Sequence, residues 1–465
     1  MARSPAALWI GFCLAVPLVH AAPDPAAWVP MRWPWTDGQS LALLEGSPVN
    51  CLLLRTWTPE LLASIQKRGV VALALIEPGS DPAAAARQAL KASASGIVLE
   101  GDFPVEAAAA VRQAAGAAPV IELTARSRMA LGSSAPILGT YQGVWPGISD
   151  EHANAKSAGP SGSTWIDTNT GFIRAARAWG DSIIWIANSP PPHTVITTAR
   201  YLQAIADAAM SGGRWVVTLD ADFIARLGRR DADALASWRR MSTLLRYFES
   251  HPEWRAMREY GKLAVIQDPA KGGLVSGGIL DMIAVKHTPV VPVPRQKLAP
   301  GSLEGESMAV NVDADSLTPE QKEILRNFAR SGGSLLTGPP GWKDASPPGE
   351  RITLDQAELD RLNDIWRDVN SMIGRRNLGV RLFNVSSMLS NVLASADGKT
   401  QVVQLVNYSD YPVESVTVHF LGNYKRATLL TPEGIEKPLE IYTTEDGSGV
   451  DIDKVQVCAT IRLEP

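Results

Sequence analysis

Cysteine is scarce in this sequence of 465 residues, which contains only Cys13, Cys51 and Cys458. A small disulfide-stabilised fold is therefore excluded, because such folds place several cysteine pairs in a short chain. Cys51 falls in an apolar run, and Cys458 lies far from it near the other end of the sequence. Two buried free thiols are the favoured interpretation, and a disulfide between them is the alternative.

Several signatures of catalysis and ligand binding are also missing. The six histidines form no HxH or HExxH pattern, so a histidine-based metal site has no support. There is no GxSxG motif of a serine hydrolase and no glycine loop of a nucleotide binder. The formal net charge of −4 argues against nucleic acid or an anionic membrane as a partner. We expect neither a cofactor nor a metal.

Long apolar stretches are absent except at the start of the chain. Arg3 precedes the apolar run 6–19, and the small residues Ala21 and Ala22 are followed by Pro23. This order is typical of a cleavable signal peptide, and the run is too short for a bilayer core of about 30 Å. We expect residues 1–22 to be removed and the mature chain to be secreted or periplasmic, free of the membrane. An N-terminal membrane anchor is the alternative.

Short apolar runs alternate with helical patterns between about residues 48 and 251. Such runs are typical of buried parallel strands, each followed here by a helix or a loop. Eight strands are predicted: 49–57, 70–77, 96–103, 119–124, 137–145, 164–169, 182–188 and 214–220. Eight such units without a dinucleotide fingerprint favour a (β/α)8 TIM barrel over residues 23–260, with a doubly wound open sheet as the alternative.

Two smaller units follow the predicted barrel. Residues 261–345 repeat the strand–helix pattern and predict a flavodoxin-like α/β domain. Residues 346–379 predict a linker rich in proline and glycine, with a helix over 354–374. From residue 380 to 465, alternating apolar and polar positions separated by turn residues predict a small antiparallel β-sandwich.

The order of barrel, flavodoxin-like domain and β-sandwich resembles that of the family 42 β-galactosidases and related barrel glycoside hydrolases. The similarity is strongest in the middle domain, in segments 278–285 with 288–290 and in 317–321 with 328–333. The resemblance implies a saccharide substrate and carboxylate acid/base chemistry in the barrel. It also implies a middle domain that packs and forms homo-oligomers without taking part in the chemistry.

Glycosidic cleavage uses two carboxyl groups, which lie at the carboxyl-terminal mouth of such a barrel. The predicted catalytic residues are therefore acids in or at the ends of strands, namely Glu122, Asp220, Asp167 and Glu100. Indole, amide and acidic side chains that could contact a sugar are Trp57, Asp102, Gln142, Trp145, Asn169, Trp185, Asn188 and Asp222. The competing interpretation is structural, because such acids also cap helices and tryptophans also fill cores. On the sandwich, Tyr408 and Tyr411 are candidates for glycan contacts.

The resemblance places the acid/base at the end of strand four and the nucleophile at the end of strand seven. Glu122 fits the first position, but Asn188 occupies the second. Three explanations stay open. In the first, the strand count is shifted by one. In the second, the two catalytic carboxyl groups come from other positions, for instance Glu122 with Asp167 or Asp220. In the third, the barrel is a non-hydrolytic relative that binds carbohydrate or serves as a scaffold.

Overall fold

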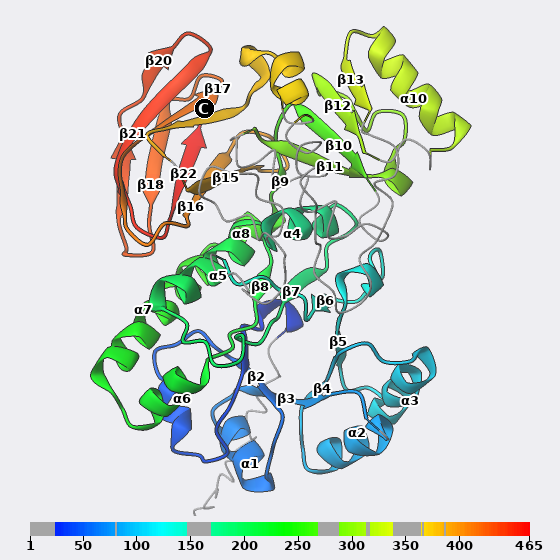
Figure 1. The fold of residues 1–465 in the computed structure, drawn as a ribbon, viewed down its shortest axis with the longest axis vertical. Coiled ribbons are helices and arrows are strands. Elements are labelled where there is room, and N and C mark those ends of the chain that lie inside the picture. The colour runs from blue at the N-terminus through cyan, green and yellow to red at the C-terminus, as the bar shows by residue number, and fades with distance from the viewer. Residues whose placement is uncertain are drawn as a thin grey trace, which may run out of the picture.

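The computed structural model describes residues 24–79, 81–146, 169–267, 288–312, 317–337, 364, 367–385 and 387–465. The expected signal segment and most of the predicted helix over 354–374 lie outside these residues. Figure 1 shows three parts: a barrel in the lower half, an antiparallel sandwich at the upper left and a second parallel sheet at the upper right.

Eight parallel strands in the order β1 to β8 form the barrel, so the predicted TIM barrel is confirmed. The strands are β1 (Pro30–Arg32), β2 (Cys51–Leu54), β3 (Val71–Ile76), β4 (Gly96–Glu100), β5 (Val120–Thr124), β6 (Ile137–Thr140), β7 (Ile183–Ile186) and β8 (Arg214–Trp215). A parallel bridge between Met31 of β1 and Val217, just after β8, completes the ring.

The numbering of the strands differs from the prediction. The predicted first strand, 49–57, is the second barrel strand, because Pro30–Arg32 precedes it and pairs with it. The predicted sixth strand, 164–169, lies outside the described residues except for Asn169, which begins a helix. The first five predicted strands therefore each move up by one position. A strand of three residues shows no periodicity, so only its pairing identifies it.

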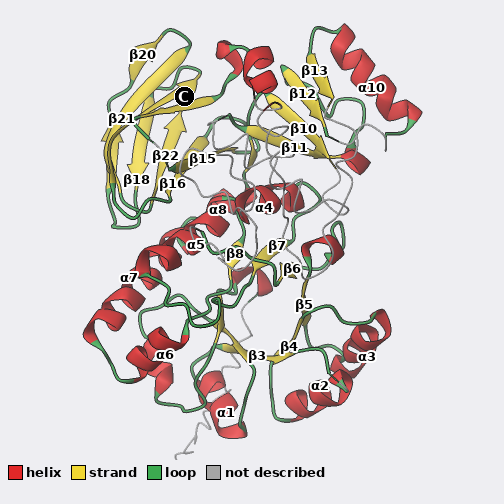
Figure 2. Ribbon diagram, in the orientation of Figure 1, coloured by secondary structure: helices red, strands yellow, loops and turns green. Residues whose placement is uncertain are grey.

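Helices surround the barrel, as the red ribbons of Figure 2 show. They are η2 (Ser40–Leu44), α1 (Pro59–Lys67), α2 (Pro82–Lys91), α3 (Val105–Ala115), η3 (Arg126–Arg128), α4 (Asn169–Arg177), α5 (Thr198–Met210), α6 (Ala221–Gly228), α7 (Ala232–Glu249) and α8 (Glu253–Ala256). Thr58, Asp81, Asp220 and Asp231 each accept a hydrogen bond from a backbone N–H in the first turn of a helix. Such capping fixes where the helices that follow these residues begin.

The barrel strands bury both of their faces. One set of side chains fills the barrel interior: Cys51, Leu53, Val71, Leu73, Leu75, Val98, Ile121, Leu123, Ile137, Trp185, Ala187 and Val216. The residues between them, such as Leu52, Leu99 and Ile184, pack against the surrounding helices. Because successive strand residues point to opposite faces, this alternation decides which side chains can face the mouth of the barrel.

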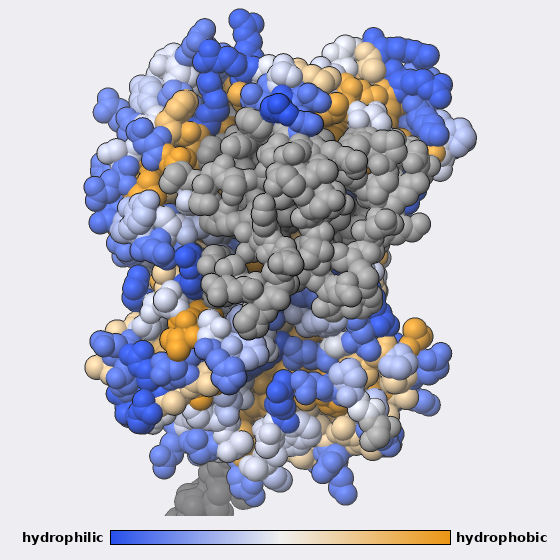
Figure 3. Space-filling view, in the orientation of Figure 1, coloured by the Kyte–Doolittle hydropathy of each residue, from blue (hydrophilic) through white to orange (hydrophobic). Residues whose placement is uncertain are grey.

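The second parallel sheet has the strand order β11-β10-β12-β13, which confirms the flavodoxin-like middle unit. Its strands are β10 (Leu263–Gln267), β11 (Val290–Pro294), β12 (Met308–Asn311) and β13 (Ser334–Thr337), and η4 (Arg295–Lys297) follows β11. Helix α10 (Pro319–Arg330) packs Leu325 and Phe328 toward the sheet. Its outer side, at the upper right of Figure 3, is mostly hydrophilic. Homo-oligomer formation through this unit stays a prediction.

Two antiparallel sheets form the C-terminal sandwich, as predicted. One has the order β14-β17-β21-β20 and the other the order β19-β18-β22-β16-β15-β9. The bounds are β9 (Arg258–Glu259), β14 (Val380–Phe383), β15 (Met388–Ala394), β16 (Gln401–Asn407), β17 (Val413–Leu421), β18 (Arg426–Leu430), β19 (Glu436–Leu439), β20 (Tyr442–Thr444), β21 (Gly447–Val455) and β22 (Cys458–Glu464). Strand β9 comes directly after the barrel helices and pairs with β15. This edge strand of the sandwich therefore lies much earlier in the sequence than the other strands of its sheet.

The six-stranded sheet of the sandwich packs against helices α5 and α7 of the barrel. Across this interface the Tyr408 hydroxyl donates to the carboxylate of Asp207 at 2.5 Å, and the Tyr247 hydroxyl donates to Thr460 at 2.7 Å. Burial raises the pKa of Asp207. Tyr408 is only 2% exposed, so its expected role as a surface glycan contact is not available to it, whereas Tyr411 is 63% exposed.

Cys51 and Cys458 are both buried and free, which confirms the favoured interpretation over a disulfide. Within the described ranges, no helix combines the length and the apolarity that crossing a bilayer requires.

A pH-dependent stability is expected from Glu306, which precedes β12. Burial raises the pKa of its carboxyl group from 4.5 to about 7, and the nearby Lys262 opposes this effect. The folded chain therefore holds a proton that the unfolded chain loses near pH 4.5, and the free energy of unfolding falls as the pH rises from about 4.5 to 7. Glu306→Gln, which is neutral throughout, should reduce this fall by about 1–2 kcal/mol, a value discounted for partial solvent contact. Denaturant titrations across this pH range measure the difference, and Glu304→Gln, at an exposed neighbour, is the control.

Candidate active site at the mouth of the barrel

Four polar side chains meet at the carboxyl-terminal end of the barrel interior. Arg32 ends β1 and Glu100 ends β4, while Ser189 and Thr218 follow β7 and β8. The guanidinium of Arg32 forms an ion pair with Glu100 and donates to Ser189 at 3.2 Å and to Thr218 at 3.1 Å. These contacts close the apolar interior with a polar layer that faces the mouth.

The ion pair of Arg32 and Glu100 is largely withdrawn from solvent, with the two side chains 11% and 12% exposed. Burial lowers the pKa of Arg32 to about 10, the charge of Arg55 acts in the same direction, and Glu77 opposes them. Arg32 thus stays cationic at neutral pH, and a contacting cation favours the ionised form of a carboxyl group. The second carboxylate oxygen of Glu100 is buried and has no hydrogen-bond partner among the described residues.

A cavity of about 300 Å³ opens beside Arg32. Its walls include Arg32, Trp33, Trp35, Arg55 and Thr218. The two indole rings meet edge to face, with 4.8 Å between their centroids. The volume lies at the lower end of the range of about 300–1,000 Å³ that is common for small-molecule sites. Aromatic surface beside charged and hydroxyl groups suits a ligand with both apolar faces and hydroxyls.

Glu122 lies on the outside of the barrel. It belongs to β5, and its neighbours Ile121 and Leu123 point into the interior. By strand alternation its own carboxylate points toward the helices, where it forms an ion pair with Arg112 of α3. The structure therefore directs Glu122 away from the mouth, where an acid/base would have to lie.

The corrected strand count brings Glu100 to the end of strand four. Glu100 points inward, as its alternation with the inward-facing Val98 requires. After strand seven the chain continues with Ala187, Asn188 and Ser189, and the Asn188 amide donates to the carbonyl oxygen of Gly143 at 2.6 Å. Of the two positions that the resemblance implies, the first thus carries a carboxylate and the second does not.

The fold of this chain is similar to that of solved structures of other proteins. No protein-family model matches the chain, and no curated protein matches it. An α-L-fucosidase, isoenzyme 2 from Paenibacillus thiaminolyticus, is similar over 94% of this chain and 99% of its own, with a TM-score of 0.61 and 10% identity. A β-galactosidase from Rahnella sp. R3 is similar over 94% and 98%, with a TM-score of 0.55 and 8% identity. The chain shares the fold of these two glycoside hydrolases. This confirms the structural resemblance inferred from the order of the domains.

Among the remaining predicted acids, Asp220 and Asp222 lie at the start of a helix outside the mouth. Asp220 follows β8 but caps α6, accepting from the backbone N–H of Phe223 at 3.0 Å and from the Tyr201 hydroxyl at 2.7 Å. Asp222 lies in the first turn of the same helix, beside Arg226 at 3.9 Å. Asp167 lies outside the described residues.

Three of the eight predicted sugar contacts are buried in the fold. Trp145 is 1% exposed, and its indole N–H donates to the Ser189 carbonyl at 3.2 Å. Trp185 is fully buried in the barrel interior. Asn169 is also fully buried and exchanges two hydrogen bonds of 2.8 Å with the backbone of Val144. Trp57 is partly buried and packs against the core between the barrel and its helices.

Asp102 and Gln142 lie closer to the mouth, after β4 and β6. The Asp102 carboxylate is 17% exposed and accepts hydrogen bonds from the Tyr141 hydroxyl at 2.9 Å and from the backbone N–H of Ala125 at 3.0 Å. Gln142 accepts from the backbone N–H of Arg126 at 2.6 Å. Burial, together with the hydrogen bond to Asp102, raises the pKa of Tyr141 to about 12, so this tyrosine stays a hydrogen-bond donor.

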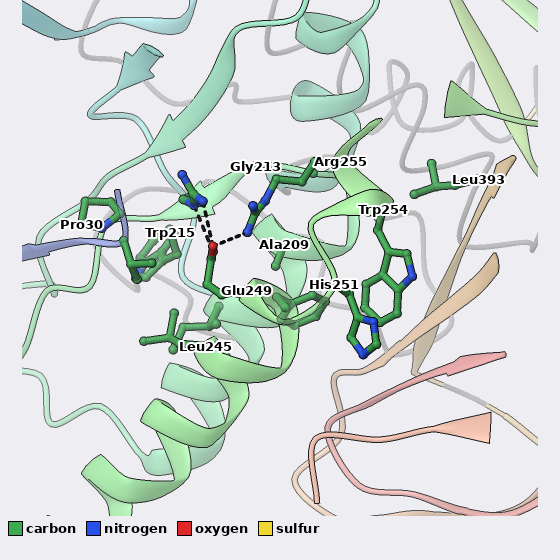
Figure 4. A pocket seen from close by; sticks show the side chains of 15 residues that line it. Pro30, Ala209, Gly213, Trp215, Leu245, Glu249, His251, Trp254, Arg255 and Leu393 are labelled. Carbon is green, nitrogen blue, oxygen red and sulfur yellow. Dashed lines mark hydrogen bonds and ion pairs between the residues drawn. The ribbon is translucent and has the colours of Figure 1, made fainter. Parts of the chain in front are cut away.

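A second cavity, at the opposite end of the barrel, is unsuited to a substrate. Glu249 forms ion pairs with Arg214, at 2.8 Å, and with Arg255, at 2.5 Å. Figure 4 shows Glu249 and Arg255 on the wall of this cavity. The free volume is only about 20 Å³, which is room for about one water molecule. In the described part of the chain, no three His, Cys, Asp or Glu side chains come together as a metal site. Barrel enzymes carry their chemistry at the carboxyl-terminal ends of the strands, so the mouth with Arg32 and Glu100 is the candidate active site.

Proposed function

We propose that this chain is an exported glycoside hydrolase that binds a saccharide at the barrel mouth and cleaves it with Glu100 as a reacting carboxylate. The observation that supports this proposal is the inward-facing carboxylate of Glu100 at the end of the fourth strand. Its ion-pair partner Arg32 lines a cavity walled by Trp33 and Trp35. Barrel enzymes carry their chemistry at this end of the strands. Export rests on the signal-peptide pattern of residues 1–22.

The partner of Glu100 decides which part of the reaction it performs. A carboxylate paired with the Arg32 guanidinium suits a nucleophile, a base or a stabiliser of positive charge at the anomeric carbon. The proton for the leaving oxygen must then come from a second acid. Asp102, which follows Glu100 by two positions and is partly exposed, is a candidate among the described residues.

The proposal is tested by assaying the purified mature chain on a panel of aryl glycosides and reducing-end-labelled oligosaccharides. Release of the aryl group or of shorter oligosaccharides is the expected result. Calorimetric titration with the same oligosaccharides separates binding from turnover. If the chain neither binds nor cleaves any member of the panel, the mouth is not a saccharide site and the proposal fails.

Trp35→Ala is expected to weaken saccharide binding about tenfold. The partly exposed indole of Trp35 lines the cavity, and loss of its contact with a sugar ring removes about 1.4 kcal/mol of apolar burial. The measurement is the calorimetric dissociation constant, or KM if the substrate turns over. Trp179→Phe is the control, because Trp179 does not line this cavity. Equal affinity of Trp35→Ala and the unmodified chain would place the sugar elsewhere.

Carbohydrate binding without hydrolysis is the second candidate function. Two observations favour it: Arg32 already occupies the inner side of Glu100, and Asn188 stands where strand seven would carry the second carboxylate. Calorimetric binding of an oligosaccharide without any product after prolonged incubation would support this function over hydrolysis.

A further inference from the structure

The outer face of the four-stranded sheet of the sandwich carries a cluster of aromatic and polar side chains. Its members come from β14, β17, β20 and β21, and we call them the aromatic patch: Phe383, His419, Tyr442, Thr417 and Asp451. The alternate residues of these strands, such as Val416 and Val418, point inward to the core shared with the other sheet. Figure 1 shows β20 and β21 at the outer left of the sandwich, away from the barrel.

Contacts within the aromatic patch hold its side chains in place. The His419 ring lies between two others, with its centroid 4.7 Å from that of Phe383 and 5.8 Å from that of Tyr442. Its Nε2 atom is 3.2 Å from the Tyr442 hydroxyl. The Thr417 hydroxyl donates to Asp451 at 2.6 Å. Phe383 is nevertheless 41% exposed, so an ordered aromatic surface is open to a ligand.

Gly449 of β21 provides the space under two of these rings. It pairs with His419 on one neighbouring strand and with Tyr442 on the other. A Cβ atom at this position would lie 2.6 Å from the Tyr442 ring and 2.8 Å from the His419 ring. Both rings therefore lie over the glycine, close to the sheet, and any larger residue would displace them.

The charges around the patch point to a neutral ligand. Arg381 is paired with Asp446 at 3.1 Å and is not free to bind an anion. Burial and the charge of Arg381 lower the pKa of His419, which keeps its ring neutral at neutral pH. The remaining charge in the patch is the Asp451 carboxylate, which repels phosphate and sulfate and accepts hydrogen bonds from hydroxyl groups.

We propose that the aromatic patch is a second saccharide-binding site, which holds a neutral polysaccharide chain across β14, β17, β21 and β20. Sugar rings pack their C–H faces against Phe383 and Tyr442, and their hydroxyls donate to Asp451. Three strand spacings of about 4.8 Å give a span of about 14 Å, which accommodates more than one sugar unit. This site is independent of the chemistry proposed for the barrel mouth.

The test is affinity electrophoresis of the full chain in gels that contain soluble mixed-linkage β-glucan, galactan or arabinoxylan. At least one polymer should retard the unmodified chain. Phe383→Ala and Tyr442→Ala should each weaken the apparent association constant about fivefold or more, since each removes one stacking surface. Gly449→Ala should have a similar effect, because it keeps every aromatic residue and only displaces two rings. Tyr260→Ala is the matched control, at an exposed tyrosine outside the patch.

Three results would overturn the inference. One is an absence of retardation by all three polymers. Another is equal retardation of the unmodified chain and the patch variants, with unchanged thermal unfolding. Retardation that is lost in Trp35→Ala but kept in Phe383→Ala also contradicts the patch and assigns the binding to the barrel mouth. Conversely, a chain that is retarded through the patch but cleaves no glycoside supports this inference and contradicts the proposed hydrolysis.

Discussion

Glu100→Gln is expected to lower kcat on any glycoside that the chain cleaves by about 10²- to 10⁴-fold, the usual effect of losing a reacting acid or base. Glutamine keeps the size of the side chain but can neither attack an anomeric carbon nor take up a proton. KM should change much less, because Trp33 and Trp35 still line the cavity. Steady-state kinetics on the best substrate of the panel gives both parameters.

The matched control for this substitution is Glu122→Gln. The two glutamates lie on neighbouring strands, but Glu122 faces the helices and Arg112, so its replacement should leave kcat within about twofold. Loss of activity in Glu122→Gln with normal activity in Glu100→Gln would reverse our assignment. Glu100→Gln also leaves the Arg32 guanidinium without its counterion, so thermal unfolding must accompany the kinetics. The double variant Arg32→Gln/Glu100→Gln removes that imbalance and should be equally inactive.

Trp185→Ala is expected to destabilise the barrel by about 3–5 kcal/mol. The indole is fully buried among interior side chains such as Leu73, Val98 and Ile121, and alanine would leave a cavity that the closed ring of strands cannot collapse. The melting temperature should fall by roughly 6–20 °C, as measured by circular dichroism or calorimetry. Trp185→Phe, which refills most of the space, should lose less.

The same substitution distinguishes the two interpretations of Trp185. If its indole stacked on sugar, Trp185→Ala would weaken saccharide binding and leave the melting temperature nearly unchanged. Trp35→Ala provides the comparison, because Trp35 is only partly buried and lines the cavity. We expect the two variants to behave oppositely: Trp185→Ala loses stability and Trp35→Ala loses affinity.

The sequence was sufficient to predict the order of the three layers and most of the strands, because runs such as Val71–Ile76 are apolar throughout and alternate with capped helices. It was not sufficient for Pro30–Arg32, which consists of three residues followed by Trp33 and Pro34. That segment is a strand only because a partner runs along each side of it. One missed strand then shifted the count by which the catalytic position was assigned.

Whether a carboxylate faces the barrel interior or the surrounding helices was harder to predict than whether it lies in a barrel strand. Glu100 and Glu122 both stand in apolar barrel strands, whose two faces are equally hydrophobic, so local pattern does not tell inside from outside. Tertiary contacts distinguish the two residues: Glu100 pairs with Arg32 of a distant strand, whereas Glu122 pairs with Arg112 of a helix. The buried state of Asn169 depends likewise on contacts that no periodicity reveals.

The pairing of β9 with β15 also constrains how the chain assembles as it is made. Glu259 finds its partner in Leu393, more than a hundred residues later, and the whole flavodoxin-like sheet is synthesised in between. At a synthesis rate of about 5–20 residues per second, β15 is synthesised roughly 7–27 s after β9. An unpaired edge of only two residues offers little template for association with another chain during that time. The middle sheet is thus an insertion within the sandwich, and its folding must bring β9 and β15 together before the sandwich can be completed.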